Sequence, residues 1–209
     1  MSIKITTLVE NSVYGKGLQG EHGLSLLVDT GEHRLLFDTG ASDLFIRNAR
    51  ILGIDLKEVD FLVLSHGHRD HTGGLHHFLA VNDKAQVVCK RELFQPKFKD
   101  ERENGVMQPD ALDSTRFRFV DEVTELCRGV FVFPQLPVTD EEDTHFEHFF
   151  TWTEGRKQAD TFTDELALAL KQGAEVSVLS ACSHRGITNI IRAVQEYFPQ
   201  TSLKLVLGG

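Results

Sequence analysis

The feature that most constrains this chain is a run of metal-ligating residue types directly after an apolar segment. Residues 61–64 are all apolar, which is typical of a buried strand. Four ligand-type side chains follow within six positions: His66, His68, Asp70 and His71. In an extended segment, side chains two positions apart point the same way, so the first two imidazoles can reach one ion. The carboxylate and the third imidazole can reach a second point where the chain turns into a helix.

The residue types in this motif favour metal binding over a set of surface histidines. A single histidine in a turn is usually solvated, but four ligand types at this spacing after a buried strand are a different case. Imidazole and carboxylate ligands suit zinc, and also manganese or iron. The motif holds no thiolate, whereas closed structural zinc sites commonly use cysteine and catalytic sites keep a position open for water. We therefore expect one or two divalent metal ions, zinc foremost, at a catalytic site.

Length and composition set the class of protein and its partners. The chain has 209 residues, enough for one large domain over 1–209. Its 31 acidic and 22 basic residues give a net charge of −9, which argues against a nucleic-acid-binding surface. The three cysteines show no paired spacing, so we expect no disulfide framework and a reducing, cytoplasmic compartment. We also expect no signal peptide and no membrane partner, because no segment has the required apolar length. A small-molecule substrate remains as the expected partner, and the oligomeric state stays open.

Periodicity and apolar runs predict a mixed α/β chain. The predicted strands cover residues 3–9, 24–28, 33–37, 61–64, 86–89, 117–120, 129–133, 166–170, 176–179 and 203–207. The predicted helices cover residues 44–52, a segment that starts at the metal motif and runs through 75–79, then 91–94 and 187–198. Residues 96–116 turn polar and indicate a solvated insertion, with a lid as the alternative. Residues 139–157 combine acidic and aromatic side chains, and we expect an irregular loop that covers or lines a cleft.

The pattern His-x-His-x-Asp-His after an apolar strand resembles the metallo-β-lactamase superfamily. Six further stretches narrow the resemblance: residues 8–11, 21–25, 37–40, 164–168, 182–187 and 207–209. Together they resemble the subgroup of methanopterin-pathway dihydropterin ribofuranosylaminobenzene phosphate synthases, which includes many uncharacterised hydrolase-like members. The resemblance runs nearly end to end. It implies an α/β fold, specifically a four-layer αββα sandwich with a one- or two-metal site at one edge.

The second ligand-bearing turn follows the apolar strand at 176–179. His184 lies in a Cys-Ser-His-Arg-Gly stretch at 182–186, so strand, histidine and helix follow one another as in the first motif. The resemblance implies that His184 is a metal-site residue, and two strand ends at one edge can bring it near the first motif. The alternative is a capping or buried, hydrogen-bonded histidine. Cys182 is either a thiolate ligand or a small buried residue. Arg185 can pair with a substrate phosphate or carboxylate, or it is an exposed residue at a helix start.

The resemblance also implies which residues hold each metal. The first metal would take His66, His68 and His184, and the second would take Asp70, His71 and a C-terminal histidine. Members of the family usually continue after Leu207-Gly208-Gly209 with an aromatic residue and that histidine. We therefore expect either that the C-terminus of the fold is incomplete here, without a final strand or helix, or that this ligand has been lost.

Two more residues are assigned supporting roles by the resemblance. Asp38 would lie beneath the metal site and orient a ligand histidine through a hydrogen bond, although a turn-forming aspartate explains the sequence equally well. His22 belongs to the subgroup pattern beside a glycine-rich loop, so it can approach substrate over the metals. The alternative for His22 is an ordinary hairpin residue.

The leading functional hypothesis is a metal-dependent hydrolase. A metal-bound hydroxide would attack an ester, amide, lactone or phosphoester of a small molecule, and the metal would stabilise the oxyanion. Asp70 could also act in catalysis by orienting the water or carrying a proton. The subgroup resemblance suggests a pterin- or phosphate-bearing substrate. A di-iron redox protein and a non-catalytic ligand-binding protein on the same fold remain as alternatives.

Overall fold

The computed structural model describes residues 2–106, 114–153 and 155–209. The described residues form two compact units, each built from two separate segments. Unit 1 comprises Met1–Cys89 and Gly105–Arg118, and unit 2 comprises Lys90–Asn104 and Phe119–Gly209. Because the chain changes unit three times, neither unit is a continuous stretch of sequence. A single domain over 1–209 stays a prediction.

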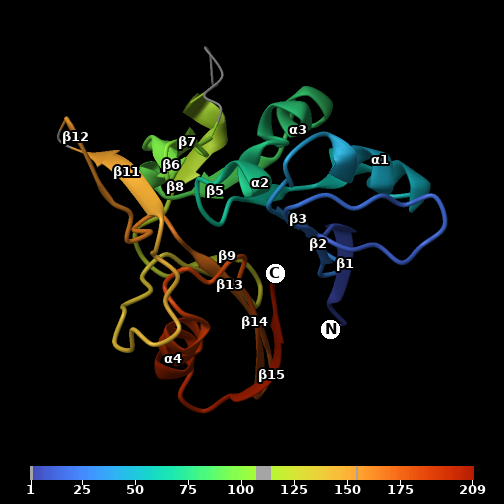
Figure 1. The fold of residues 1–209 in the computed structure, drawn as a ribbon. Coiled ribbons are helices and arrows are strands. Elements are labelled where there is room, and N and C mark those ends of the chain that lie inside the picture. The colour runs from blue at the N-terminus through green and yellow to red at the C-terminus, as the bar shows by residue number, and fades with distance from the viewer. Residues whose placement is uncertain (1, 107–113, 154) are drawn as a thin grey trace. The chain divides into compact units, whose positions relative to one another are not determined.

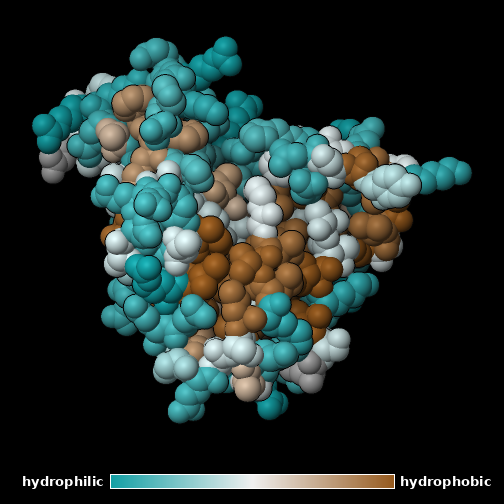
Figure 2. All heavy atoms as spheres, turned by 60° about the horizontal axis from the view of Figure 1, so that its bottom comes forward, coloured by the Kyte–Doolittle hydropathy of each residue, from teal (hydrophilic) through white to brown (hydrophobic). Residues whose placement is uncertain are grey.

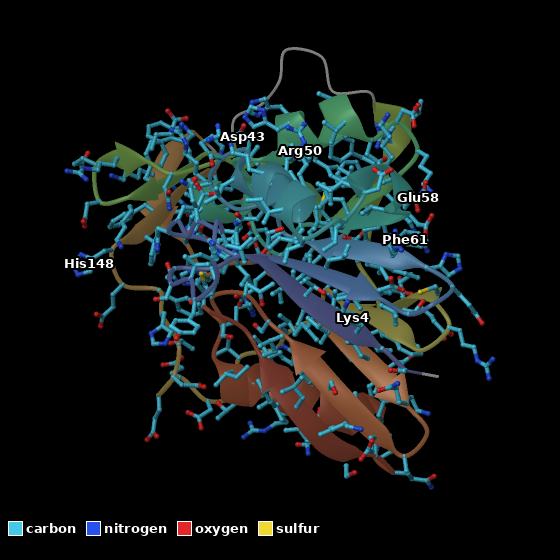
Figure 3. The ribbon with its side chains drawn as sticks, turned by 90° about the vertical axis from the view of Figure 1, so that its right-hand side faces the viewer. Lys4, Asp43, Arg50, Glu58, Phe61 and His148 are labelled. Carbon is cyan, nitrogen blue, oxygen red and sulfur yellow. The ribbon has the colours of Figure 1, made fainter. Side chains whose placement is uncertain are left out.

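Unit 1 is built on a sheet with the strand order β1-β2-β3-β4-β5-β8, and the unit boundary falls within β8. The strands are β1 Lys4–Val9, β2 Ser25–Asp29, β3 Arg34–Phe37, β4 Phe61–Val63, β5 Gln86–Cys89 and β8 Phe117–Phe119. The helices are α1 Leu44–Ile51, η1 Leu56–Glu58, α2 Arg69–Thr72, α3 Leu75–Val81 and η3 Ser114–Arg116. Helices α1, α2 and α3 lie along one side of the sheet (Figure 1). In Figure 3, Lys4 and Phe61 mark β1 and β4, and Asp43 and Arg50 mark the two ends of α1.

The direction of the strands in unit 1 decides where its polar turns meet. β1, β2 and β3 form an antiparallel meander, whereas β3, β4 and β5 run parallel. Parallel strands end at the same edge of a sheet. The turn after β3 and the turn after β4 therefore lie together, and these turns carry Asp38 and the histidine motif.

Unit 2 contains two sheets in the described residues. One has the order β15-β14-β13-β10-β9, and the other has the order β12-β11-β6-β7. The strands are β6 Lys97–Lys99, β7 Arg102–Glu103, β9 Thr124–Cys127, β10 Val130–Phe133, β11 Phe149–Thr153, β12 Arg156–Ala159, β13 Ala167–Gln172, β14 Glu175–Leu179 and β15 Ser202–Leu207. The helices are η2 Arg91–Phe94 and α4 Ile187–Tyr197. Ile190 and Val194 of α4 pack with Ala167, Val176 and Phe133 in a buried core on the first of these sheets.

The edge strand β15 carries apolar side chains at the surface. Leu203, Leu205 and Val206 are exposed, at the end of the five-stranded sheet. Figure 2 shows apolar side chains reaching the surface on the face that it presents. An exposed edge strand with apolar residues favours pairing with another strand. In the described residues, no helix is long and apolar enough to cross a membrane.

Most predicted elements are confirmed, but the irregular loop expected at 139–157 and the single helix expected through the metal motif are wrong. The loop expected at 139–157 contains the start of a hairpin, because β11 pairs with β12 and also with β6. β6 and β7 lie in the polar segment at 96–116, whose residues 107–113 lie outside the described residues. The sequence missed this sheet because its strands are short and their partners lie about fifty residues apart.

The helix expected to run through the metal motif is divided into α2 and α3 at Gly73 and Gly74. A Cβ atom at Gly73 would lie 2.3 Å from the carbonyl oxygen of Ala41, and one at Gly74 would lie 2.5 Å from that of Thr39. The turn after β3 therefore approaches the backbone of the motif so closely that only glycine fits. This close approach packs the turn that carries Asp38 against the turn that carries the metal motif.

Asn82, which follows α3, ties the connections around β4 together. Its Nδ2 donates to the carbonyl oxygens of Leu56 and Val59, both at 2.9 Å, and its Oδ1 accepts from the N–H of Ala85 at 2.7 Å. We expect Asn82→Ala to lower the free energy of unfolding by about 3 kcal/mol, because several buried backbone groups lose their partner. Urea unfolding measures this, with the exposed Asn11→Ala as a control that changes stability by less than about 0.5 kcal/mol. Equal stability of the two variants would contradict this role of Asn82.

Candidate metal centre

The carboxylate of Asp38 organises the turn that carries the metal motif. The residue is fully buried, and its backbone has a φ of 60°. Its N–H donates to the carbonyl oxygen of Val63 at 2.9 Å. Its Oδ1 accepts from the N–H of Ser65 at 2.7 Å, and its Oδ2 accepts from the Ser65 hydroxyl at 2.6 Å and from Nδ1 of His71 at 2.8 Å. Asp38 thus fixes the chain just before and just after the first two motif histidines.

The hydrogen bonds also fix which ring nitrogen carries the proton in two motif histidines. A carboxylate only accepts, so Nδ1 of His71 donates to Asp38 and its Nε2 keeps the lone pair. The Ser65 hydroxyl gives its proton to Asp38 and therefore accepts from Nδ1 of His66 at 2.9 Å. Nε2 of His66 accordingly also keeps its lone pair. This is the arrangement in which a neighbouring group orients a metal-ligating imidazole.

The ligand-type side chains of unit 1 come together as the spacing predicts. The ring centroid of His66 lies 4.7 Å from that of His68 and 4.4 Å from that of His71. Oδ2 of Asp70 lies 3.4 Å from Nε2 of His71. With the His71 proton on Nδ1, these two atoms are both acceptors, and a cation that binds both of them removes their repulsion. The donor set of imidazoles and a carboxylate therefore fits a divalent metal.

The surroundings of Asp70 favour its ionised form, which is the form that binds a metal ion. Burial alone raises the pKa of Asp70, but the contact with His71 and the nearby His68 lower it below its ordinary value. His22 lies at the exposed side of this group, with its Nε2 3.4 Å from Oδ2 of Asp70 and its Nδ1 2.8 Å from Oδ1 of Asn11. The side chain of His22 is 85% exposed, so it is accessible to a small molecule.

His184 lies in unit 2, at the turn between β14 and α4. Its Nδ1 donates to the carbonyl oxygen of His145 at 2.9 Å, so the lone pair is on Nε2. The N–H of His145 in turn donates to the carbonyl oxygen of His184 at 2.8 Å. His184 therefore has the same tautomer as His66 and His71, and again a neighbouring acceptor sets it. Sequence reasoning did not find this contact of His145, because a backbone carbonyl leaves no signal in the residue type.

Glu165 holds the turn that carries His184. Its two carboxylate oxygens accept from the N–H groups of His184 and Arg185, both at 2.8 Å. Burial raises the pKa of Glu165 to about 7, against the lowering effect of these two N–H groups. Sequence reasoning also gave Glu165 no role, although an acidic residue beside an apolar strand was a signal for one.

Arg185 uses its guanidinium within unit 2. Its Nε donates to the carbonyl oxygen of Leu136 and its Nη1 to that of Thr161, both at 2.6 Å. Burial lowers the pKa of Arg185, while Glu165 raises it. These contacts connect two loops to the start of α4. Contact of Arg185 with a substrate stays a prediction. Cys182, which the sequence leaves open between a thiolate ligand and a small buried residue, is half-buried.

Comparison with known proteins agrees with this chemistry. A sequence model of the metallo-beta-lactamase superfamily matches residues 18–163. The chain belongs to this superfamily. The resemblance drawn from the motifs is thereby confirmed, and membership implies a fold that binds divalent metal ions.

Three relatives show how far the similarity to members of the superfamily extends. The 7,8-dihydropterin-6-methyl-4-(beta-D-ribofuranosyl)-aminobenzene-5'-phosphate synthase of Methanocaldococcus jannaschii is 28% identical, over 100% of this chain and 77% of that protein. An uncharacterised protein of the same organism is 29% identical, over 98% of this chain and 78% of that protein. The crystal structure of a metal-dependent hydrolase of the beta-lactamase superfamily has a TM-score of 0.83 and 33% identity, over 100% of this chain and 76% of that one.

A more distant structure supports the fold alone. A quorum-quenching N-acyl homoserine lactone lactonase has a TM-score of 0.53 at 15% identity, over 88% of this chain and 79% of that one. The α/β fold class predicted from the sequence is therefore confirmed as metallo-β-lactamase-like.

We expect Asp38→Asn to weaken zinc binding by about 10- to 100-fold, because the amide would direct a donor at the Ser65 hydroxyl or at Nδ1 of His71. Asparagine tolerates a positive φ as aspartate does, so the backbone is preserved. Chelator competition on the purified chain measures the affinity. Asp43→Asn, at an exposed ion pair with Arg47, is the matched control and keeps wild-type affinity. A folded Asp38→Asn protein with unchanged zinc affinity would contradict the orienting role.

Proposed function

We propose that this protein is a metal-dependent hydrolase that acts on an ester, lactone or phosphoester of a small molecule. The main support is a pair of acceptor atoms: Oδ2 of Asp70 lies 3.4 Å from Nε2 of His71. The imidazoles of His66 and His68 lie beside this pair. Similarity to a metal-dependent hydrolase at 33% identity supports the same reaction class.

In the proposed site, His66 and His68 hold a first metal and Asp70 and His71 contribute to a second. His184 is the proposed further ligand of the first metal, as its motif and its tautomer support. Zinc is the proposed metal, with manganese or iron as alternatives that nitrogen and oxygen ligands also accept. A bound divalent metal ion supplies Lewis acidity and lowers the pKa of water toward about 7.

The residues of the chain have separate tasks in this proposal. Asp38 and Ser65 keep the protons of His71 and His66 on Nδ1, so that both Nε2 atoms stay available as ligands. Asp70, whose pKa is lowered below its ordinary value, is ionised at neutral pH and is proposed to act in catalysis by orienting a water molecule. His22, exposed beside Asp70, is the proposed contact with the substrate.

The proposed substrate is a small molecule that bears a phosphate or a pterin. The similarity to a synthase named for a dihydropterin with a ribofuranosyl phosphate supports this class. The net charge of −9 disfavours a nucleic acid as substrate. A cytoplasmic location stays a prediction.

Elemental analysis of protein purified without chelator, joined to a hydrolysis screen, tests the proposal. We expect zinc or manganese to co-purify and turnover of chromogenic phosphoesters or lactones that a chelator removes. His68→Ala should lower kcat/KM by on the order of 1,000-fold, since loss of a ligand removes several kcal/mol of transition-state stabilisation. The exposed His76→Ala on α3 is the matched control and keeps activity.

Three results would contradict the proposal. Protein that binds no metal even after reconstitution would favour a non-catalytic ligand-binding protein on the same fold. Iron with an oxygen-dependent signal would favour redox chemistry. Equal activity of His68→Ala and the wild type would show that the histidine motif takes no part in the reaction.

A further inference from the structure

The imidazole of His184 lies between two phenylalanine rings of unit 2. The Phe162 ring stacks on it with a centroid distance of 3.7 Å and an interplanar angle of 9°. The Phe149 ring meets it edge-on at 5.0 Å and 74°. With Nδ1 bound to the carbonyl oxygen of His145, the plane and the direction of the imidazole are both defined. His184 is 5% exposed, so the imidazole is buried together with these contacts.

Phe162 adopts a backbone conformation that is costly for a bulky residue. Its φ is 52°, and its side chain is fully buried. A non-glycine residue in this region costs about 1–3 kcal/mol and persists only where its surroundings impose it. The imposing contacts are on both sides of the residue: its N–H donates to Oδ1 of Asp160 at 2.7 Å, and its carbonyl oxygen accepts from the N–H of Glu165 at 3.0 Å.

Lys97 anchors the segment that carries Phe162. Its side chain is 1% exposed, and the ammonium group donates to Oδ2 of Asp160 and Oδ1 of Asp164, both at 2.7 Å. Burial lowers the pKa of Lys97, but Asp164 and Asp160 raise it above its usual value, so the lysine is charged. The same ammonium lies 5.3 Å from the centre of the Phe162 ring. A buried ion triad therefore fixes both ends of the turn on which the strained phenylalanine lies.

We propose that Phe162 is a positioning residue that fixes the plane of the His184 imidazole and so strengthens the metal binding of that ligand. The inference rests on the proposed function, in which His184 is a ligand. The positive φ of Phe162 places its ring parallel to the His184 imidazole. An ordinary φ would direct the side chain elsewhere. Without the ring, the imidazole can rotate, and ordering it then costs free energy when the metal binds.

Phe162→Leu tests the inference, because leucine keeps the positive φ and removes the ring. Zinc affinity is measured by chelator competition, and the visible absorption of the cobalt(II) protein reports the ligand geometry. We expect zinc to bind about 10-fold more weakly and the cobalt bands to change. Phe133→Leu is the matched control, since Phe133 is buried in the core under α4 and does not contact His184. It should lose stability and keep the wild-type affinity.

A double-mutant cycle with His184→Ala separates positioning from general damage. If Phe162 acts through His184, Phe162→Leu has no further effect on zinc affinity once His184 is alanine. Phe162→Met, which has similar bulk without a ring, repeats the test if the leucine variant does not fold.

Several outcomes would overturn the inference. Unchanged affinity in Phe162→Leu, or equal weakening with and without His184, would overturn it while the proposed function stands. Wild-type affinity in His184→Ala would overturn both this inference and the ligand role of His184. A wild-type chain that binds no metal would overturn the proposed function, and the inference with it.

Discussion

The site in unit 1 depends on burying one carboxylate, that of Asp38. An ion with no exposure to water is stable only when its oxygens are well hydrogen-bonded. Here Ser65 donates twice and His71 once, and each donor belongs to the turn that carries the metal motif. The requirement to satisfy this charge therefore positions the candidate ligands during folding. A metal entering the site meets imidazoles whose tautomers are already set.

Unit 2 uses the same physical device with a different residue. Glu165 accepts the backbone N–H groups of His184 and Arg185, as Asp38 accepts the N–H of Ser65. In each case a buried acidic side chain holds the first turn after an apolar strand. Strand ends are otherwise mobile, because their backbone groups lack ladder partners. The two acidic residues thus connect the turn that carries the histidine motif and the turn that carries His184 to the sheets beside them.

The sequence predicted what local pattern and motif spacing determine. Phe61–Val63 and the grouping of His66 with His68 follow from an apolar run and from the period of a strand, and the structure has both. It did not predict the hairpin that begins at Phe149, because its first partner strand lies about fifty residues earlier and has only three residues. The conformation of Phe162 was also hidden, since long-range contacts impose it against local preference. Carbonyl partners such as that of His145 carry no residue signature.

The ion triad of Lys97 has a consequence for the order in which the chain can fold. Its partners Asp160 and Asp164 lie 63 and 67 residues later, so a ribosome releases the lysine long before either aspartate exists. A charged ammonium cannot enter an apolar interior alone, and β6 must therefore stay solvated until that later segment emerges. The second segment of unit 1 ends at Arg118, so all of unit 1 has been synthesised before either aspartate. The first strand of unit 2 to be synthesised is thus among the last to be buried, and the first ligand-bearing turn can form before the second.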